Sequence, residues 1–239
     1  MTSTKPGYVV SLSGGKDSTA MLLMMLEKGE QVDDVVMFDM GWEFPEMYEH
    51  LDKLEQDTGL TITRLKPPTP LDYLMFDKPL AKGKRKGQKG YGWARPNARW
   101  CTSIKTNTLD KHMKQYADSI LCVGIAADET KRPTVPGKRY PLREWGTTEK
   151  QCLDYCLSRG YTWGGLYSHF DRVSCWCCPL KSLPELRALR KYHPQLWQRL
   201  LEMDDRACNS YRIDYTVKQL EERFSQEDRQ MKLELFGMI

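Results

Sequence analysis

The sequence feature that most restricts the fold is a polar, glycine-containing loop between an apolar run and a helical run near the N-terminus. Over the first 65 residues, signals for strands and helices alternate, with strands expected at 8–13, 34–39 and 61–65 and helices at 18–28 and 44–56. This alternation is typical of βαβ units. The sequence therefore predicts an α/β fold, a doubly wound parallel sheet with helices on both faces.

The loop itself reads Ser11-Leu-Ser-Gly-Gly-Lys-Asp-Ser18. Between a strand and a helix of an open α/β sheet, such a loop can bind phosphate, because glycines bring backbone N–H groups together and the helix dipole attracts anions. The spacing differs from the Walker A and dinucleotide-binding patterns. The expected nucleotide-binding residues are Ser11, Ser13, Gly14, Gly15, Lys16 and Ser18, and Asp17 is expected to hold Mg²⁺. The alternative is a plain strand-to-helix connection.

Composition limits the class of protein. The 239 residues are 40% hydrophobic and 28% charged, which excludes a disordered or collagen-like chain. The N-terminus lacks the pattern of a signal peptide, and no run reaches the roughly 18 apolar residues that a membrane span needs. A cytoplasmic protein without a membrane partner is expected.

The net charge of +4 is uneven along the chain. Residues 81–100 contain basic residues but no acidic ones, interleaved with Tyr91, Trp93 and Trp100, and a mobile basic loop is expected near 78–100. This composition suits phosphate contact and base stacking, so tRNA or DNA is a candidate partner. The alternative is a lid that captures only a small anionic nucleotide.

Regular structure is expected to return after the basic loop, with a strand at 119–125 and helices at 102–116, 148–159, 183–192, 194–206 and 216–224. We therefore expect a nucleotide-binding domain over residues 1–180, followed by a helical C-terminal extension over residues 181–239.

Two motifs resemble a known superfamily. Ser13-Gly-Gly-Lys-Asp-Ser18 is similar to the PP-loop of the N-type ATP pyrophosphatases, and Asp39-Met-Gly-Trp-Glu-Phe-Pro-Glu46 resembles the segment after the second strand in the phosphoadenosine phosphosulfate (PAPS) reductase family. The resemblance implies a fold of the HUP/PP-loop type that binds ATP or a PAPS-like adenine nucleotide. It also implies that the backbone of Met37 and Phe38 reads the adenine edge, with Asp39 assisting at a metal or ribose.

A third block, Gly124-Ile-Ala-Ala-Asp-Glu-Thr-Lys-Arg132, resembles the loop after the fourth strand of that family, which faces the phosphate or sulfate end. Ala126 stands where the family has an arginine. The resemblance implies nucleotide binding by Gly124 and catalytic roles for Lys16, Asp17 and Arg132. The alternative for this block is a solvated junction with incidental charge.

Eight cysteines in a reducing compartment are not expected to form disulfides, so metal binding becomes the expected use for some of them. The segment Cys175-Trp-Cys-Cys-Pro179 contains a C-x-x-C pair, Cys175 and Cys178, and a metal-binding loop is expected near 171–179. Cys122, Cys152 and Cys156 are expected in the core.

The resemblance adds Cys101 as a third ligand, because iron–sulfur PAPS-type reductases have a Cys-Cys pair where this chain has Trp100-Cys101. A [4Fe–4S] cluster is implied, with Cys177, Cys208 or a non-protein group as the fourth ligand. Zinc is the alternative, since ligand spacing does not separate the two metals.

Three functions follow from these motifs. The first is an ATP pyrophosphatase or adenylating sulfurtransferase that receives sulfur or electrons from a donor protein. The second is a PAPS reductase that uses thioredoxin, but residues 230–239 contain no cysteine, and Cys208, expected in a helix, is the one candidate thiol. The third is a non-catalytic nucleotide- or nucleic-acid-binding module with structural zinc. Homo-oligomerisation stays open.

Overall fold

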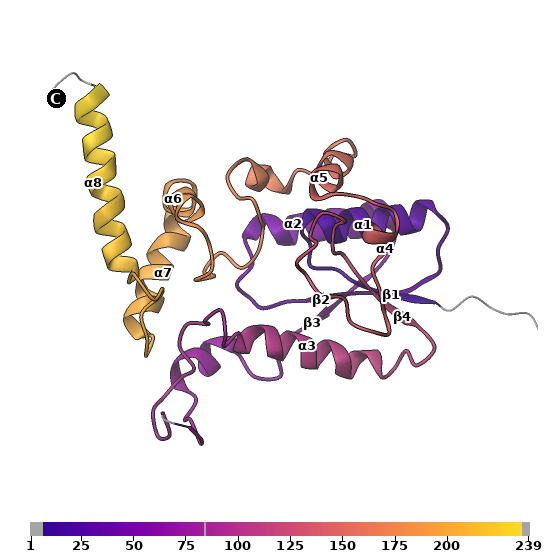
Figure 1. The fold of residues 1–239 in the computed structure, drawn as a ribbon, viewed down its shortest axis with the longest axis horizontal. Helices are drawn as coiled ribbons and strands as arrows, with labels where there is room; N and C mark the ends of the chain where they lie inside the picture. The colour runs from indigo at the N-terminus through magenta and orange to yellow at the C-terminus, as the bar shows by residue number, and fades with distance from the viewer. Residues whose placement is uncertain (1–6, 84, 236–239) are drawn as a thin grey trace, which may run out of the picture. The chain divides into compact units, whose positions relative to one another are not determined.

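The computed structural model describes residues 7–83 and 85–235 (Figure 1). The chain forms two compact units, each discontinuous in sequence. The first, which we call the sheet unit, comprises the residues up to 68 together with 103–175. The second, which we call the helical unit, comprises residues 69–102 and the residues from 176 onward. Residues 69–102 thus group with the C-terminal helices.

The sheet unit is built on five parallel strands in the order β3-β2-β1-β4-β5. The strands are β1 (Tyr8–Ser11), β2 (Val32–Phe38), β3 (Ile62–Leu65), β4 (Ile120–Val123) and β5 (Lys138–Arg139). The chain moves outward from β1 to β3 and then returns to the other side of β1 with β4. The predicted doubly wound parallel sheet is confirmed, and the reversal beside β1 is where ligands bind in such sheets.

Helices cover both faces of this sheet, as predicted (Figure 1). On one side lie α1 (Lys16–Glu27), α2 (Pro45–Thr58), α4 (Pro141–Glu144) and α5 (Glu149–Leu157), and on the other lies α3 (Trp100–Met113). The core under α3 contains Val9, Val36, Leu109 and Leu121, all buried. Helix α1 is buried over most of its length and packs against α5.

Several elements differ from the sequence prediction. Helix α1 begins at Lys16 rather than at residue 18, so Lys16 and Asp17 belong to its first turn. Strand β5, helix α4 and a 3-10 segment at Trp163–Ser168 were not predicted. These pieces are short, and Gly164 and Gly165 within the 3-10 segment adopt left-handed conformations, so no hydrophobic period extends far enough to reveal them.

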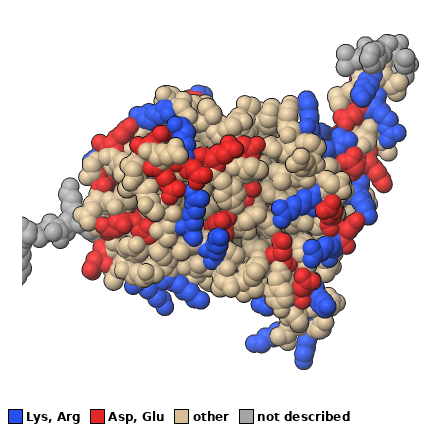
Figure 2. All heavy atoms as spheres, turned by 180° about the vertical axis from the view of Figure 1, so that it is seen from behind, with Lys and Arg blue, Asp and Glu red and all other residues tan. Residues whose placement is uncertain are grey.

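The described residues of the helical unit include a π-helix at Tyr73–Asp77 and the helices α6 (Leu183–Tyr192), α7 (Pro194–Arg206) and α8 (Val217–Leu235). Helix α8 continues well beyond the predicted end at residue 224. It carries interspersed charges of both signs, visible at the upper right of Figure 2. Arg187 and Arg190 of α6 bind carboxylates of α8, Glu227 and Glu221, which explains how so polar a helix is held.

Residues 78–100, the basic loop of the sequence analysis, which we call the basic segment, fold back on themselves within the helical unit. Pro79 pairs with Lys89 in an isolated bridge, and Arg95 pairs with Ala98. Arg85 donates to the carbonyl oxygens of Gly90 and Tyr91 at 2.9 and 3.2 Å. Within residues 7–83 and 85–235, no helix has the length and apolar character that crossing a membrane requires.

Candidate functional site

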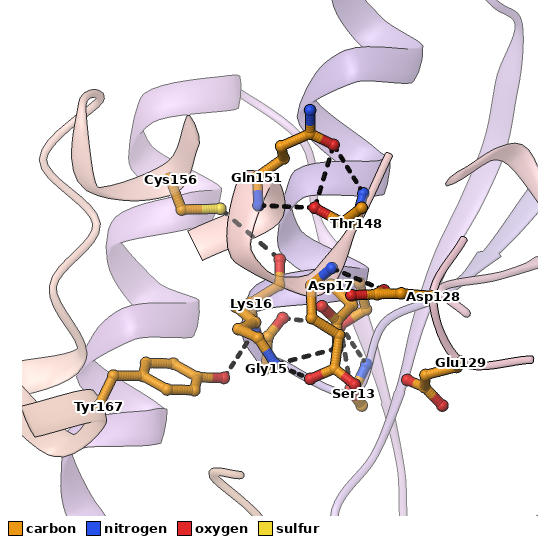
Figure 3. A network of polar contacts seen from close by, with 12 residues as sticks. Ser13, Gly15, Lys16, Asp17, Asp128, Glu129, Thr148, Gln151, Cys156 and Tyr167 are labelled. Carbon is orange, nitrogen blue, oxygen red and sulfur yellow. Dashed lines mark hydrogen bonds and ion pairs between the residues drawn. The ribbon is translucent and has the colours of Figure 1, made fainter. Parts of the chain in front are cut away.

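The loop between β1 and α1 is ordered by hydrogen bonds among its own residues (Figure 3). The Ser13 N–H donates to Ser18 Oγ at 3.0 Å, and Ser18 Oγ donates to the Gly15 carbonyl at 3.1 Å. Gly14 has a φ of +78°, a left-handed conformation that favours glycine, and a Cβ there would lie 2.7 Å from the flexible end of the Met47 side chain. Gly15 precedes α1 without any side-chain cap. The first N–H groups of α1 therefore have no cap from Gly15, and that of Lys16 donates to Tyr167 Oη instead.

Lys16 is almost fully buried, at 6% exposure, and both of its polar groups have partners from distant segments. Its backbone N–H donates to Tyr167 Oη at 2.7 Å, as Figure 3 shows. Its ammonium group lies 2.6 Å from Glu149 Oε2 and 3.5 Å from Asp17 Oδ2. Burial of Tyr167 at this position raises the pKa of its hydroxyl, so the group stays neutral.

Two carboxylate oxygens beside the loop are buried without a hydrogen-bond partner in the described part of the chain: Asp17 Oδ1 and Glu129 Oε1. Burial raises the pKa of Asp17 to about 6; Lys16 opposes this shift, whereas Glu149 and Glu129 add to it. Unsatisfied buried carboxylate oxygens are costly. Carboxylate oxygens in this state can accept a hydrogen bond or bind a cation.

The loop after β4 lies directly against the start of α1. A Cβ on Gly124 would be 2.8 Å from Ser18 Cα, so glycine permits this approach. Arg132 has an exposed side chain that pairs with Glu129 Oε2 at 3.2 Å. Arg143 binds the carbonyl oxygens of Glu129 and Arg132 at 2.6 and 2.7 Å and so fixes the loop.

The predicted adenine-contacting residues lie at the end of β2. Val36 accepts from Leu12 on the β1 side, and backbone groups alternate sides along a strand. Met37 therefore directs its backbone groups to β3, where its register partner is Arg64, whereas those of Phe38 face the β1 side beyond the last residue of β1. Asp39 accepts from Gly41 N–H and Tyr48 Oη, both at 2.8 Å, and shapes the following turn.

The cysteines fall into three groups. Cys122, Cys152 and Cys156 are fully buried, so their predicted place in the core is confirmed. Burial raises the pKa of the Cys122 and Cys156 thiols to about 12, which keeps them protonated. Cys156 donates to the Lys16 carbonyl at 3.6 Å and so contacts the loop from Ser11 to Ser18, which we call the phosphate loop after its predicted ligand (Figure 3).

The candidate ligands are divided between the units. Cys101 and Cys178 both belong to the helical unit; burial raises the pKa of each thiol, and the Cys101 thiol raises that of Cys178 further. Cys175 ends the sheet unit, where its Sγ lies 3.4 Å from Met40 Sδ and 3.8 Å from Glu43 Oε1. Among the described residues, no group of three or more His, Cys, Asp and Glu side chains has the arrangement of a metal centre.

The two candidates for a fourth ligand differ in exposure. Cys177 is buried, and Cys208 is exposed. The expectation that Cys208 lies in a helix is wrong, because α7 ends at Arg206 and Ala207 is extended. Cys208 contacts the guanidinium group of Arg85 and the carbonyl oxygen of Gly90, both within the helical unit.

Sequence reasoning missed Glu129, Glu149 and Tyr167. Glu129 lies inside the block 124–132, next to Asp128. The sequence gives no reason to prefer one acidic residue over the other, and only the structure shows that Glu129 is partly buried and Asp128 exposed. Glu149 lies between Thr148 and Gln151, whose spacing is a capping-box signal. This signal predicts the start of a helix but not that Glu149 contacts Lys16. Tyr167 follows two glycines and carries no local signal.

Comparisons with known proteins agree with these features. Residues 7–181 match the family described as the phosphoadenosine phosphosulfate reductase domain. An uncharacterized protein of Methanocaldococcus jannaschii is 28% identical over 211 residues, covering 82% of this chain and 41% of that protein. The chain thus spans less than half the length of that relative.

Two solved structures are similar to the chain. One is a phosphate complex of the phosphoadenylyl-sulfate (PAPS) reductase of Candida auris, with a TM-score of 0.48 and 15% identity over 72% of this chain and 83% of that one. The other is the NH3-dependent NAD synthetase of Campylobacter jejuni in complex with nitrate, with a TM-score of 0.46 and 12% identity over 85% of each chain.

Proposed function

This chain belongs to the phosphoadenosine phosphosulfate reductase domain family, and from that premise we propose that it binds ATP with Mg²⁺ and transfers the adenylyl group, releasing pyrophosphate. The phosphates would bind at the loop from Ser11 to Ser18, with Gly124 supporting the loop. Of the two residues predicted at the adenine, Phe38 would read its edge through backbone groups on the β1 side, whereas the backbone groups of Met37 are directed to β3. Asp39 would lie at the ribose or metal.

The observation that carries this proposal is the pair of buried, unpartnered carboxylate oxygens, Asp17 Oδ1 and Glu129 Oε1. Carboxylate oxygens are the ligands that Mg²⁺ prefers, so the residues present fit this ion. When bound, Mg²⁺ would neutralise charge on the phosphates. A sulfonucleotide reductase needs a nucleophilic thiol for its chemistry, and the two carboxylates supply none.

The residues act mainly through position and charge. An acceptor atom attacks the α-phosphorus of ATP, a bond forms between them, and the bond between the α-phosphorus and the bridging oxygen breaks. Pyrophosphate leaves with that electron pair. Lys16 and the N–H groups of the loop would stabilise the charge on pyrophosphate, and Arg132 would stabilise charge at the reacting phosphorus.

Sulfur handling is the finer part of the proposal. Cys101, Cys175 and Cys178 would hold a [4Fe–4S] cluster or, in the alternative, zinc; Cys101 and Cys178 are both partly buried thiols, and Cys101 raises the pKa of Cys178, which fits two ligands of one centre. The cluster would supply an iron that carries sulfide from a donor protein. The basic segment would bind the acceptor, a tRNA or DNA.

Pyrophosphate release tests the proposal. Protein incubated with ATP, Mg²⁺ and tRNA or DNA should release pyrophosphate, and Asp17→Asn should lower the rate on the order of a hundredfold. Asp118→Asn changes an exposed aspartate of the same unit and serves as the matched control. Sulfite formation from PAPS and thioredoxin without pyrophosphate from ATP would establish the reductase instead.

A further inference from the structure

The lysine of the phosphate loop is already paired with a carboxylate. Lys16 Nζ lies 2.6 Å from Glu149 Oε2, although the two residues are far apart in sequence. The lysine side chain is 8% exposed, and the glutamate side chain is 35% exposed. Water therefore does little to screen the lysine, and Glu149 is its closest counter-charge.

The position of Glu149 is fixed from two sides. It is the first residue of α5, directly after Thr148, whose side chain and that of Gln151 form a reciprocal capping box. Its backbone N–H donates to Asp128 Oδ1 at 3.0 Å. The carboxylate that holds Lys16 is thus anchored both to a helix start and to the loop after β4.

The charges around the loop are unbalanced. Glu129 and Glu149 both raise the pKa of Asp17. Lys16 and Arg132 are the cations paired with them. A nucleoside polyphosphate that binds here brings several more negative charges. Lys16, which would offset them, already pairs with Glu149 and Asp17.

We propose that Glu149 makes nucleotide binding by this loop conditional on a divalent cation. By compensating the charge of Lys16, Glu149 prevents a metal-free polyphosphate from using that charge fully, whereas a polyphosphate that arrives with its cation brings its own compensation. Glu149 acts through Lys16 and is a specificity-determining positioning residue. The inference rests on the proposed use of ATP, whose test is separate.

Calorimetric titration of ATP, with and without Mg²⁺, tests this role. The wild-type protein should bind ATP with Mg²⁺ and much more weakly in buffer cleared of divalent cations. Glu149→Gln should tighten metal-free binding by about tenfold to a hundredfold, because Lys16 becomes available for a charge-assisted hydrogen bond to phosphate, and should change Mg²⁺-dependent binding much less.

Asp154→Asn is the matched control, because Asp154 lies on the same helix and pairs with the exposed Lys150. It should leave both affinities unchanged. Thermal unfolding checks that Glu149→Gln folds; if it does not, Glu149→Asp, which shortens the side chain by one methylene, should raise metal-free affinity in the same direction.

The outcomes separate the two proposals. Wild-type protein that binds no ATP even with Mg²⁺ overturns both. Binding that is equally tight with and without Mg²⁺ overturns the role of Glu149 and leaves ATP as the ligand. Metal-free affinity that stays constant or falls in Glu149→Gln also overturns this role. A fall in both the metal-free and the Mg²⁺-dependent affinity would show that Glu149 only supports the structure of the site.

Discussion

The phosphate loop of the sheet unit and the cysteine and basic segments of the helical unit are stabilised in opposite ways. The phosphate loop and the loop after β4 keep charged groups buried and partly unsatisfied, with Asp17 Oδ1 and Glu129 Oε1 lacking partners within the described residues. In the helical unit, side chains of the short segment 209–212 bind the backbone of the cysteine segment and of the basic segment. Tyr211 Oη donates to the Cys178 carbonyl, and Arg212 donates to that of Lys181, both at 2.8 Å.

The same short segment also holds the basic segment. Asn209 accepts from the Trp93 N–H at 2.7 Å and donates to the Trp93 carbonyl at 3.1 Å. Arg95 donates in return to the Ser210 carbonyl at 2.7 Å. The two regions therefore differ in how their polar groups are satisfied: buried carboxylate oxygens beside the phosphate loop lack partners, whereas segment 209–212 fixes backbone shape through satisfied hydrogen bonds.

The largest expected effect tests whether the buried carboxylate of Asp17 destabilises the folded protein. Asp17 has a pKa of about 6 in the folded protein, against an ordinary value of 3.8. The unfolded chain therefore loses this proton first, and Asp17 lowers the free energy of unfolding as pH rises from about 4 to 6. Asp17→Asn should be more stable than wild type by up to about 3 kcal/mol above pH 7, the gain fading toward pH 4.

Urea unfolding in Mg²⁺-free buffer between pH 4 and 8 measures this difference. Asp118→Asn, on the surface of the same unit, should show no such pH-dependent gain. If Asp17→Asn is less stable than wild type at pH 7, the loop carries no electrostatic cost, and the contrast between the two regions disappears.

This contrast also explains what the sequence could predict. The phosphate loop was found because its serines, glycines and lysine are consecutive residues between a strand and a helix, so local patterns report it. Glu149 and Tyr167 were not found, because they reach Lys16 from across the fold, and no local pattern encodes such a contact. The parallel sheet was predictable because its strands are buried apolar runs; β5, with two residues, is too short to have a pattern.

The helical unit shows the same limit more strongly. The thiols of Cys101 and Cys178 were recognisable by spacing and resemblance. Their backbone support from Tyr211 and Arg212 was not, since a tyrosine and an arginine in a polar stretch are indistinguishable from surface residues until burial is known. Tyr211 is in fact fully buried.

The second prediction therefore concerns Tyr211. Tyr211→Phe keeps the ring but removes the donor to the Cys178 carbonyl, which should lower the free energy of unfolding by about 1 to 3 kcal/mol. Iron or zinc bound per chain should fall as well, because the cysteine loop loses its anchor. Urea unfolding and metal analysis measure the two effects.

Tyr73→Phe is the control, since Tyr73 belongs to the same unit and is 44% exposed. It should change neither stability nor metal content. Unchanged stability in Tyr211→Phe would show that the backbone of the cysteine loop holds its shape without this hydrogen bond, and the helical unit would then lose its distinguishing feature.

The smallest effect is expected at the surface of the basic segment, where charge is exposed to water rather than buried. Lys82, Lys86 and Lys89 are exposed, so salt screens them, in contrast to Lys16. Changing all three to Gln should weaken binding of tRNA or DNA by about tenfold at low salt and reduce the slope of log affinity against log salt by about 2 to 3, as three lost phosphate contacts require. Changing the exposed Lys66, Lys111 and Lys114 of the sheet unit to Gln removes the same charge and should have little effect. Equal losses in the two triple variants would mean that nucleic acid responds to net charge alone, and that the basic segment is no more specialised than the rest of the surface.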